Sequence, residues 1–541
     1  MLARAPAGSS LWACTAIGTA AVVAVPIVAV LSSLVVPSGD VWRHLWRTQL
    51  LELIVNTLLL LLGVGTGTLL VGGGLAWLVV FHRFPGRSVL EWALILPLAV
   101  PAYVIGFTFL GLFEYAGPIQ GALRGALGAG ARLPELRSYG GVVAMMTLVF
   151  YPYVYLLARV AFREQGTAAV EIARTLGRSR PAAFLAVTVP MGRPALAAGV
   201  ALAMMEALAD FGTVATFGYR TLTEAIYRVW YGMFDRIAAT QLASVLLLFA
   251  LALLLLEHRS RGRARFVQRG RASRALEAEP LRGFRAVAAT AVCLAVLGPA
   301  FVLPVGQLAW WALAATRGGR VAPDFLALLE HTALLAAAAA VLACALAVLL
   351  AYAGRLRGTL AVRLAARLAS MGYALPGAVI AVGVLLPLAW ADHVLVPPLE
   401  RVLDRPLGLL LTGSAAGLIL AYVVRFLAVG LQSVEASLGR IPPSLDDAAR
   451  TLGARAGLAL RRRRVSLEAD DVRGPGLPRV GARCPRRPRP RDVRAQSAGT
   501  SMRSTWAAGR PAIPSVNARS SRGSGSSRPT PSPIHTSRST Y

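Results

Sequence analysis

Long uninterrupted apolar stretches constrain the fold of this chain more than any other feature. Runs of 18 or more apolar residues recur between residues 11 and 432, and a run of this length is the pattern of a helix that crosses a bilayer. Only 15% of the 541 residues are charged, against about 25% in a typical soluble domain. The short alternating segments of a membrane β-barrel are not seen. The sequence therefore predicts an all-α polytopic membrane protein.

Ten membrane spans are expected, six in the first half of the chain and four in the second. They cover residues 11–36, 50–81, 89–113, 140–163, 195–218, 240–256, 284–312, 326–353, 368–390 and 409–432. The first exceeds the apolar core of a signal peptide, which has about 7–15 residues, and is counted as a span. Arg-rich loops fall on one face of this arrangement, so we expect that face and the N-terminus to be cytoplasmic.

The strong positive charge does not by itself indicate a nucleic-acid partner. The formal net charge is +30, but residues 461–541 carry 18 Arg and four acidic residues, and much of the rest lies in short loops between spans. That distribution is typical of a membrane protein, so no nucleic acid is expected as a partner. The alternative, a membrane-tethered nucleic-acid binder, predicts salt-sensitive DNA binding by residues 461–541 alone.

Lysine is absent from the sequence, since all 56 basic residues are Arg. A Walker-type phosphate-binding loop requires Lys, so the chain is not expected to be an ATPase. The four Cys form no C-x-x-C pair, and the six His are scattered. We expect no catalytic residues, no fixed metal site and no bound cofactor, with any ATP used by a partner chain.

Three landmarks recur at a nearly constant offset. Thr57 and Thr332 lie 275 positions apart, as do Pro101 and Pro376, and the glycines that end "EIARTLG" and "DAARTLG" lie 276 apart. Such an offset predicts a tandem repeat in one orientation, with a transport pathway at the interface between repeats.

The repeat divides the chain into four predicted segments. These are a first half of about six spans (1–257), an Arg-rich cytoplasmic linker (258–283), an incomplete second half of about four spans (284–455) and a tail (456–541). The tail is rich in Arg, Pro and Ser and holds no apolar run of span length, so disorder is expected. A reading-frame change after about residue 455 explains this composition, and a genuine tail is the alternative.

The two polar copies, residues 171–177 and 447–453, each predict a short helix on the cytoplasmic face. Thr167 can cap the first of these helices and Gly177 can end it, and Ser444 can cap the second. A helix of two turns is marginal by itself, so packing against a partner must stabilise it.

The first copy resembles the cytoplasmic loop of ABC-importer permeases, which reads E-A-A, three residues, G, nine residues, I-x-L-P. The residues that match are Glu171, Ala173, Gly177, Val187, Val189 and Pro190. The second copy matches in part, through Asp447, Ala448, Ala449 and Gly453. Its match ends there, because Arg463 and Ser466 stand where Ile and Pro are expected.

The stretches 96–124 and 205–257 are similar to ferric-iron importers that fuse two type I permease halves in one chain, and the resemblance covers residues 10–455. It implies a multi-pass protein of the bacterial inner membrane. It also implies two cytoplasmic ATP-binding subunits, each holding one short helix, and an extracytoplasmic iron-binding protein. Sulfate, thiamine and polyamine permeases share this plan. An ion-coupled secondary carrier is a further alternative and would need neither polar copy.

Two acidic residues in the fifth predicted span are candidates for a translocation pathway. Glu206 and Asp210 are four positions apart and would share one helix face. Carboxylates within a span are costly, and hard Fe³⁺ prefers oxygen ligands, so these two and Tyr103 could line a polar path. The alternative is that they pair with Arg or with loop backbone and hold the helix in place.

Overall fold

The computed structural model describes residues 8–37, 39–164, 173, 175–261, 278–319, 322–356 and 359–439. The described residues belong to one compact unit of the chain, Met1–Leu452. Within them, ten helical segments are long and apolar enough to cross a membrane, as the sequence predicts.

We call the elements up to α13 the first repeat. They are α1 (Gly8–Ser32), η1 (Ser33–Val35), α2 (Asp40–Thr48), α3 (Leu50–Phe81), β1 (His82–Arg83), α4 (Arg87–Ala93), η2 (Leu96–Ala99), α5 (Ala102–Phe113), α6 (Pro118–Leu127), α7 (Tyr139–Glu164), α9 (Arg180–Ala183), η3 (Phe184–Thr188), α10 (Val189–Ala209), α11 (Phe211–Thr216), α12 (Leu222–Tyr227), η4 (Arg228–Gly232) and α13 (Arg236–Arg261).

We call the elements from α14 the second repeat. They are α14 (Phe284–Leu297), η5 (Gly298–Val302), α15 (Leu303–Arg317), α16 (Phe325–Leu356), α17 (Leu360–Ser370), η6 (Gly372–Ala374), α18 (Gly377–Leu403) and α19 (Ala415–Gly439). Just before them, β2 (Glu279–Pro280) pairs in parallel with β1.

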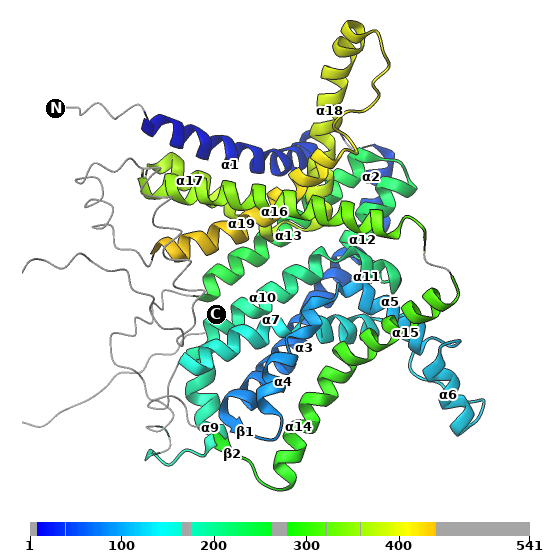
Figure 1. Cartoon of the computed structure of the whole chain (residues 1–541), viewed down its shortest axis with the longest axis vertical. Coiled ribbons are helices and arrows are strands. Elements are labelled where there is room, and N and C mark those ends of the chain that lie inside the picture. Colours follow the sequence, from blue (N-terminus) through cyan, green and yellow to red (C-terminus); the bar gives the residue numbers. More distant parts are fainter. Residues whose placement is uncertain are drawn as a thin grey trace, which may run out of the picture. The chain divides into compact units, whose positions relative to one another are not determined.

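The residues paired by the sequence offset occupy the same local structures. Thr57 in α3 and Thr332 in α16 each donate a hydrogen bond to the carbonyl four positions earlier, at 2.6 and 2.7 Å. Pro101 and Pro376 precede α5 and α18 with nearly equal backbone angles, each after a short 3-10 helix. In both repeats the helix with the Thr packs along a second long helix, α3 on α7 and α16 on α19 (Figure 1).

The predicted spans 89–113 and 368–390 are wrong in their boundaries. Residues 89–113 are not one helix, because the chain forms α4 and η2 before α5 begins after Pro101. In the second repeat α17 and η6 precede α18, which starts after Pro376 and runs on to Leu403. Pro101 and Pro376 lie outside the helices with extended ψ angles of 138° and 143°, and a proline also restricts the residue before it, so the apolar sequence does not continue as one helix there.

The first helices of the two repeats are exchanged. Helix α1 packs on α16, α17 and α18 of the second repeat (Figure 1). At its crossing with α18, a Cβ built on Gly383 would lie 2.6 Å from the Pro26 carbonyl oxygen, so only glycine fits. Conversely, Cys293 of α14 is buried in a core of the first repeat, and Thr290 donates to the Pro85 carbonyl at 2.9 Å. Each repeat therefore contributes its first helix to the packing of the other.

Candidate functional site

A polar cavity lies where the two repeats meet. It has a volume of about 380 Å³ and is lined by Tyr103, Tyr153, Glu206 and Asp210 of the first repeat and by Arg425 of α19. The three residues that the sequence nominated for a pathway thus line one cavity.

Both carboxylate oxygens of Glu206 contact the second repeat. Oε2 lies 3.4 Å from the Arg425 guanidinium, and Oε1 accepts a hydrogen bond of 3.0 Å from the Tyr373 hydroxyl. The Glu206 and Arg425 side chains are 20% and 26% exposed. Glu206 pairs with an arginine here, and this pair joins the repeats.

Asp210 lies at a helix junction, so the prediction of one continuous helix face with Glu206 is wrong. Helix α10 ends at Ala209, and the Asp210 carboxylate caps α11 by accepting from the backbone N–H of Thr213 at 2.9 Å and from its hydroxyl. An aspartate side chain that bonds nearby backbone N–H groups favours a helix start over a helix interior. The N-terminal turn of α11 then rests on Tyr103, since a Cβ on Gly212 would lie 2.6 Å from the Tyr103 Cβ.

Three residues of this site were missed in the sequence. Arg425 carried a usable signal, because it is a lone charge inside an apolar span and such charges default to a functional or pairing role. Tyr153 and Tyr373 carried none, since aromatic residues are common in membrane helices.

The cavity offers oxygen ligands without forming a tight metal site. Among the described residues no group of three or more His, Cys, Asp or Glu side chains is placed to hold a metal ion. Carboxylate and phenol oxygens are the donors that hard cations prefer. Because Arg425 offsets the charge of Glu206 and Thr213 already bonds Asp210, the arrangement favours transient contact with a passing cation over firm coordination.

The described part of the first polar copy ends as a helix C-terminus. Gly177 has φ +83°, and the Arg178 N–H donates to the Ala173 carbonyl at 3.1 Å, which is the Schellman arrangement. The expectation that Gly177 ends a helix is confirmed. Glu171 and the second copy, Asp447, Ala448, Ala449 and Gly453, lie outside the described residues. The role of both copies in coupling stays a prediction.

Replacing Gly177 by Ala should loosen this helix end. No heavy atom lies within 4 Å of a Cβ built there, so the left-handed backbone is the sole source of strain, about 1–2 kcal/mol. Amide hydrogen exchange around Arg178 should quicken about fivefold to thirtyfold. Gly125→Ala in the exposed interior of α6, which also has open space, is the control and should not quicken exchange there. Unchanged exchange in Gly177→Ala would show that the Schellman turn does not form.

The stretch that matches I-x-L-P lies at the start of α10. Val187 is in the π-helical turn η3, and Val189 and Pro190 begin α10. Pro190 has no N–H to give to the carbonyl four positions earlier, which accounts for a π-type turn directly before it.

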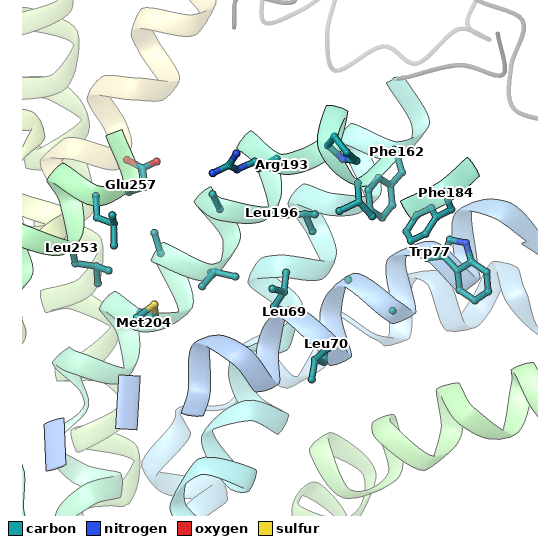
Figure 2. A pocket seen from close by; sticks show the side chains of 18 residues that line it. Leu69, Leu70, Trp77, Phe162, Phe184, Arg193, Leu196, Met204, Leu253 and Glu257 are labelled. Carbon is teal, nitrogen blue, oxygen red and sulfur yellow. The ribbon is translucent and has the colours of Figure 1, made fainter. Parts of the chain in front are cut away.

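Val189 and Pro190 also line an apolar pocket of about 780 Å³ within the first repeat. Figure 2 shows Phe162 and Phe184 near one end of it and Glu257 of α13 near the other. Its lining is mostly Leu, Val, Ala and aromatic side chains from α3, α10 and α13. An apolar surface offers no hydrogen bonds to an ion or to its hydration shell, so the smaller polar cavity is the candidate site.

Comparison with known proteins identifies the family. Residues 68–258, from α3 to α13, match the family described as "Binding-protein-dependent transport system inner membrane component". The Fe(3+)-transport system permease protein FbpB 2 of Haemophilus influenzae is 24% identical over 414 residues, which is 76% of this chain and 74% of that protein. This aligned length exceeds either repeat, so the similarity runs through both.

Other relatives match over the length of about one repeat. The sulfate transport system permease protein CysT of Salmonella typhimurium is 33% identical over 185 residues, 33% of this chain and 65% of that protein. The molybdenum transport system permease protein ModB of Escherichia coli is 30% identical over 188 residues, 34% of this chain and 78% of that protein. The part of the chain that the structure describes holds ten helical segments of span length, and the chain belongs to the family of binding-protein-dependent transport system inner membrane components.

Proposed function

We propose that this chain is the membrane-spanning permease of an ATP-driven importer and that its substrate is ferric iron. One observation carries the choice of iron. The similarity to the Fe(3+)-transport permease extends through both repeats, whereas the similarities to the sulfate and molybdenum permeases have about the length of one.

The partners follow from the family and from the two polar copies. A binding-protein-dependent permease receives its substrate from an extracytoplasmic binding protein, which here would carry Fe³⁺. Residues 171–177 and 447–453 would each hold one ATP-binding subunit on the cytoplasmic face of a bacterial inner membrane. ATP would be hydrolysed by those subunits, while this chain supplies the path and no catalytic residue.

The cavity suits passage better than storage. Asp210, Glu206 and the phenols of Tyr103 and Tyr153 provide oxygen atoms for a cation. A transporter must release its ion, so ligands that already have partners within the protein are an advantage. Because Glu206 reaches Arg425 in the other repeat, a relative movement of the repeats would change this lining.

Removing the charge of Asp210 tests the pathway. Asp210→Asn keeps an oxygen that can cap α11, so the fold should hold while Fe³⁺ uptake falls about tenfold. Uptake of radiolabelled Fe³⁺ is measured in cells that express the chain with its ATP-binding subunit and binding protein. The control is Asp235→Asn, because Asp235 bonds the Ala238 N–H in the same way before α13 and lies away from the cavity. Equal uptake in both variants would remove Asp210 from the pathway.

An oxyanion is the second candidate substrate. It is favoured by the Arg425 guanidinium in the cavity and by the sulfate and molybdenum relatives. Uptake of labelled sulfate or molybdate with no uptake of Fe³⁺ would establish it in place of iron. Uptake that continues without the ATP-binding subunit would instead indicate an ion-coupled secondary carrier.

A further inference from the structure

The corresponding long helices of the two repeats are covered to different extents. In α3, Leu53 and Thr57 are 1% and 2% exposed. Their partners at the offset of 275 in α16 are exposed, Leu328 at 56% and Thr332 likewise. The N-terminal half of α16 therefore presents a face that the first repeat buries.

The first repeat shows which segment buries this face. The Leu222 N–H donates to the Thr57 hydroxyl at 3.1 Å. About two turns further along α3, Gly65 is so close to α10 that a Cβ on it would lie 3.1 Å from the Met204 sulfur. These contacts come from α10 and from the α12 region that joins it to α13, which is the part of the repeat that follows the polar copy.

The uncovered face does not arise from a different packing of the two long helices. In the first repeat Gly72 of α3 meets Val154 of α7, where a Cβ on the glycine would lie 2.9 Å from the Val154 Cβ. In the second repeat the glycine is on the other helix of the pair. A Cβ built on Gly430 of α19 would lie 3.1 Å from the Ala347 Cβ of α16. The two helix pairs cross at corresponding residues. The face of α16 that matches the buried face of α3 is therefore free to be covered by helices placed as α10 and α12 are in the first repeat.

The exposed face of α16 has the composition of a helix–helix contact. Ala336 and Ala340 stand where the first repeat has Leu61 and Gly65, and both are exposed although both partners are buried. Small residues beside a Thr let membrane helices approach closely, whereas large apolar residues are the usual lipid-facing choice. Val341, one position further, is 71% exposed and matches a position that is exposed in the first repeat too, so this side of the helix is uncovered in both repeats.

We propose that a separate polypeptide with two membrane spans, of the kind formed by α10 and α13, docks on the N-terminal half of α16. Residues 456–541 hold no apolar run of span length and cannot supply these spans. A second copy of this chain cannot offer its own α10, which is seated on its own α3 and α7, with a Cβ on Gly199 only 2.7 Å from the Val154 Cα. The proposal is independent of the substrate.

The test places a photoreactive benzoylphenylalanine at Ala340 of the full tagged chain in its native membranes, with Val341 as the matched control position. After irradiation the chain is purified, and adducts are identified by mass spectrometry. The expected result is an adduct from position 340 at least tenfold stronger than from 341. The captured protein should contain two apolar spans of at least 18 residues, and the cross-link should map to the first.

A second pair of variants keeps the test independent of the photoreactive residue. Ala340→Trp fills the proposed contact and should lower co-purification of the identified partner at least tenfold, whereas Val341→Trp should not. An adduct of two copies of this chain, adducts with lipid alone, a captured protein without two spans, or equal co-purification in the two Trp variants would each overturn the proposal. Yield and unfolding temperature of both Trp variants confirm that the chain itself is intact.

Discussion

Gly383→Ala is expected to weaken the packing of α1 against the second repeat and to lower the unfolding temperature of the purified chain. The added methyl would lie 2.6 Å from the Pro26 carbonyl oxygen and 2.9 Å from the Pro26 Cα. Neither backbone atom can move away by a simple rotation of a side chain, so the two helices must separate. Overpacking of this kind costs about 1–3 kcal/mol, and more where backbone is the obstacle.

The control for this change is Gly306→Ala in α15, where nothing lies within 4 Å of a built Cβ. Alanine forms helix better than glycine by about 1 kcal/mol, so this variant should keep or raise the unfolding temperature. The measurement is thermal unfolding in detergent, followed by tryptophan fluorescence. If both variants unfold together with the unaltered chain, α1 does not cross α18 at Gly383.

The second large effect is expected at the ion pair between repeats. Arg425→Met leaves the Glu206 carboxylate with Tyr373 as its remaining partner in a partly buried site. Removing one member of a buried pair costs about 3–5 kcal/mol, and the exposed quarter of these side chains places the value at the lower end. Glu206→Gln alone should cost less, because the amide oxygen can still accept from Tyr373.

The double variant, Glu206→Gln with Arg425→Met, separates pairing from packing. With neither charge of this pair left, it should recover much of the stability that Arg425→Met loses, so the two changes should be strongly non-additive in thermal unfolding. Arg43→Met is the control, since the Arg43–Asp40 pair is exposed to solvent and should show no measurable change. Purely additive losses would show that the two side chains do not interact.

The candidate site could be predicted from the sequence in part. Glu206 and Asp210 stood out because a carboxylate within an apolar span is expensive and needs a reason. Arg425 obeys the same rule and was open to the same argument. Which of these groups meet was not predictable, because Glu206 and Arg425 are 219 positions apart and each repeat offers several faces on which the other could pack.

The helix boundaries, too, could be predicted from the sequence only in part. The apolar pattern placed ten spans, yet it ran across Pro101 and Pro376, where the backbone turns, and across Asp210, which caps a new helix. A hydropathy profile indicates which segments are stable in a bilayer, but it does not register a missing backbone N–H donor. Gly177 shows the opposite case, because a glycine after a short polar helix specifies a left-handed end by local geometry alone.

The sequence by itself determined the membrane-spanning class, the number of spans, the tandem offset and the helix end at Gly177, because each depends on residues close together in the chain. The tertiary structure alone decided that α1 and α14 are exchanged between repeats, that Glu206 meets Arg425, and that the N-terminal half of α16 lies open. In a bilayer an apolar surface is equally soluble against lipid and against another helix, so hydropathy cannot say which faces pair. Shape makes that choice, through close approaches such as that of Gly383 to Pro26.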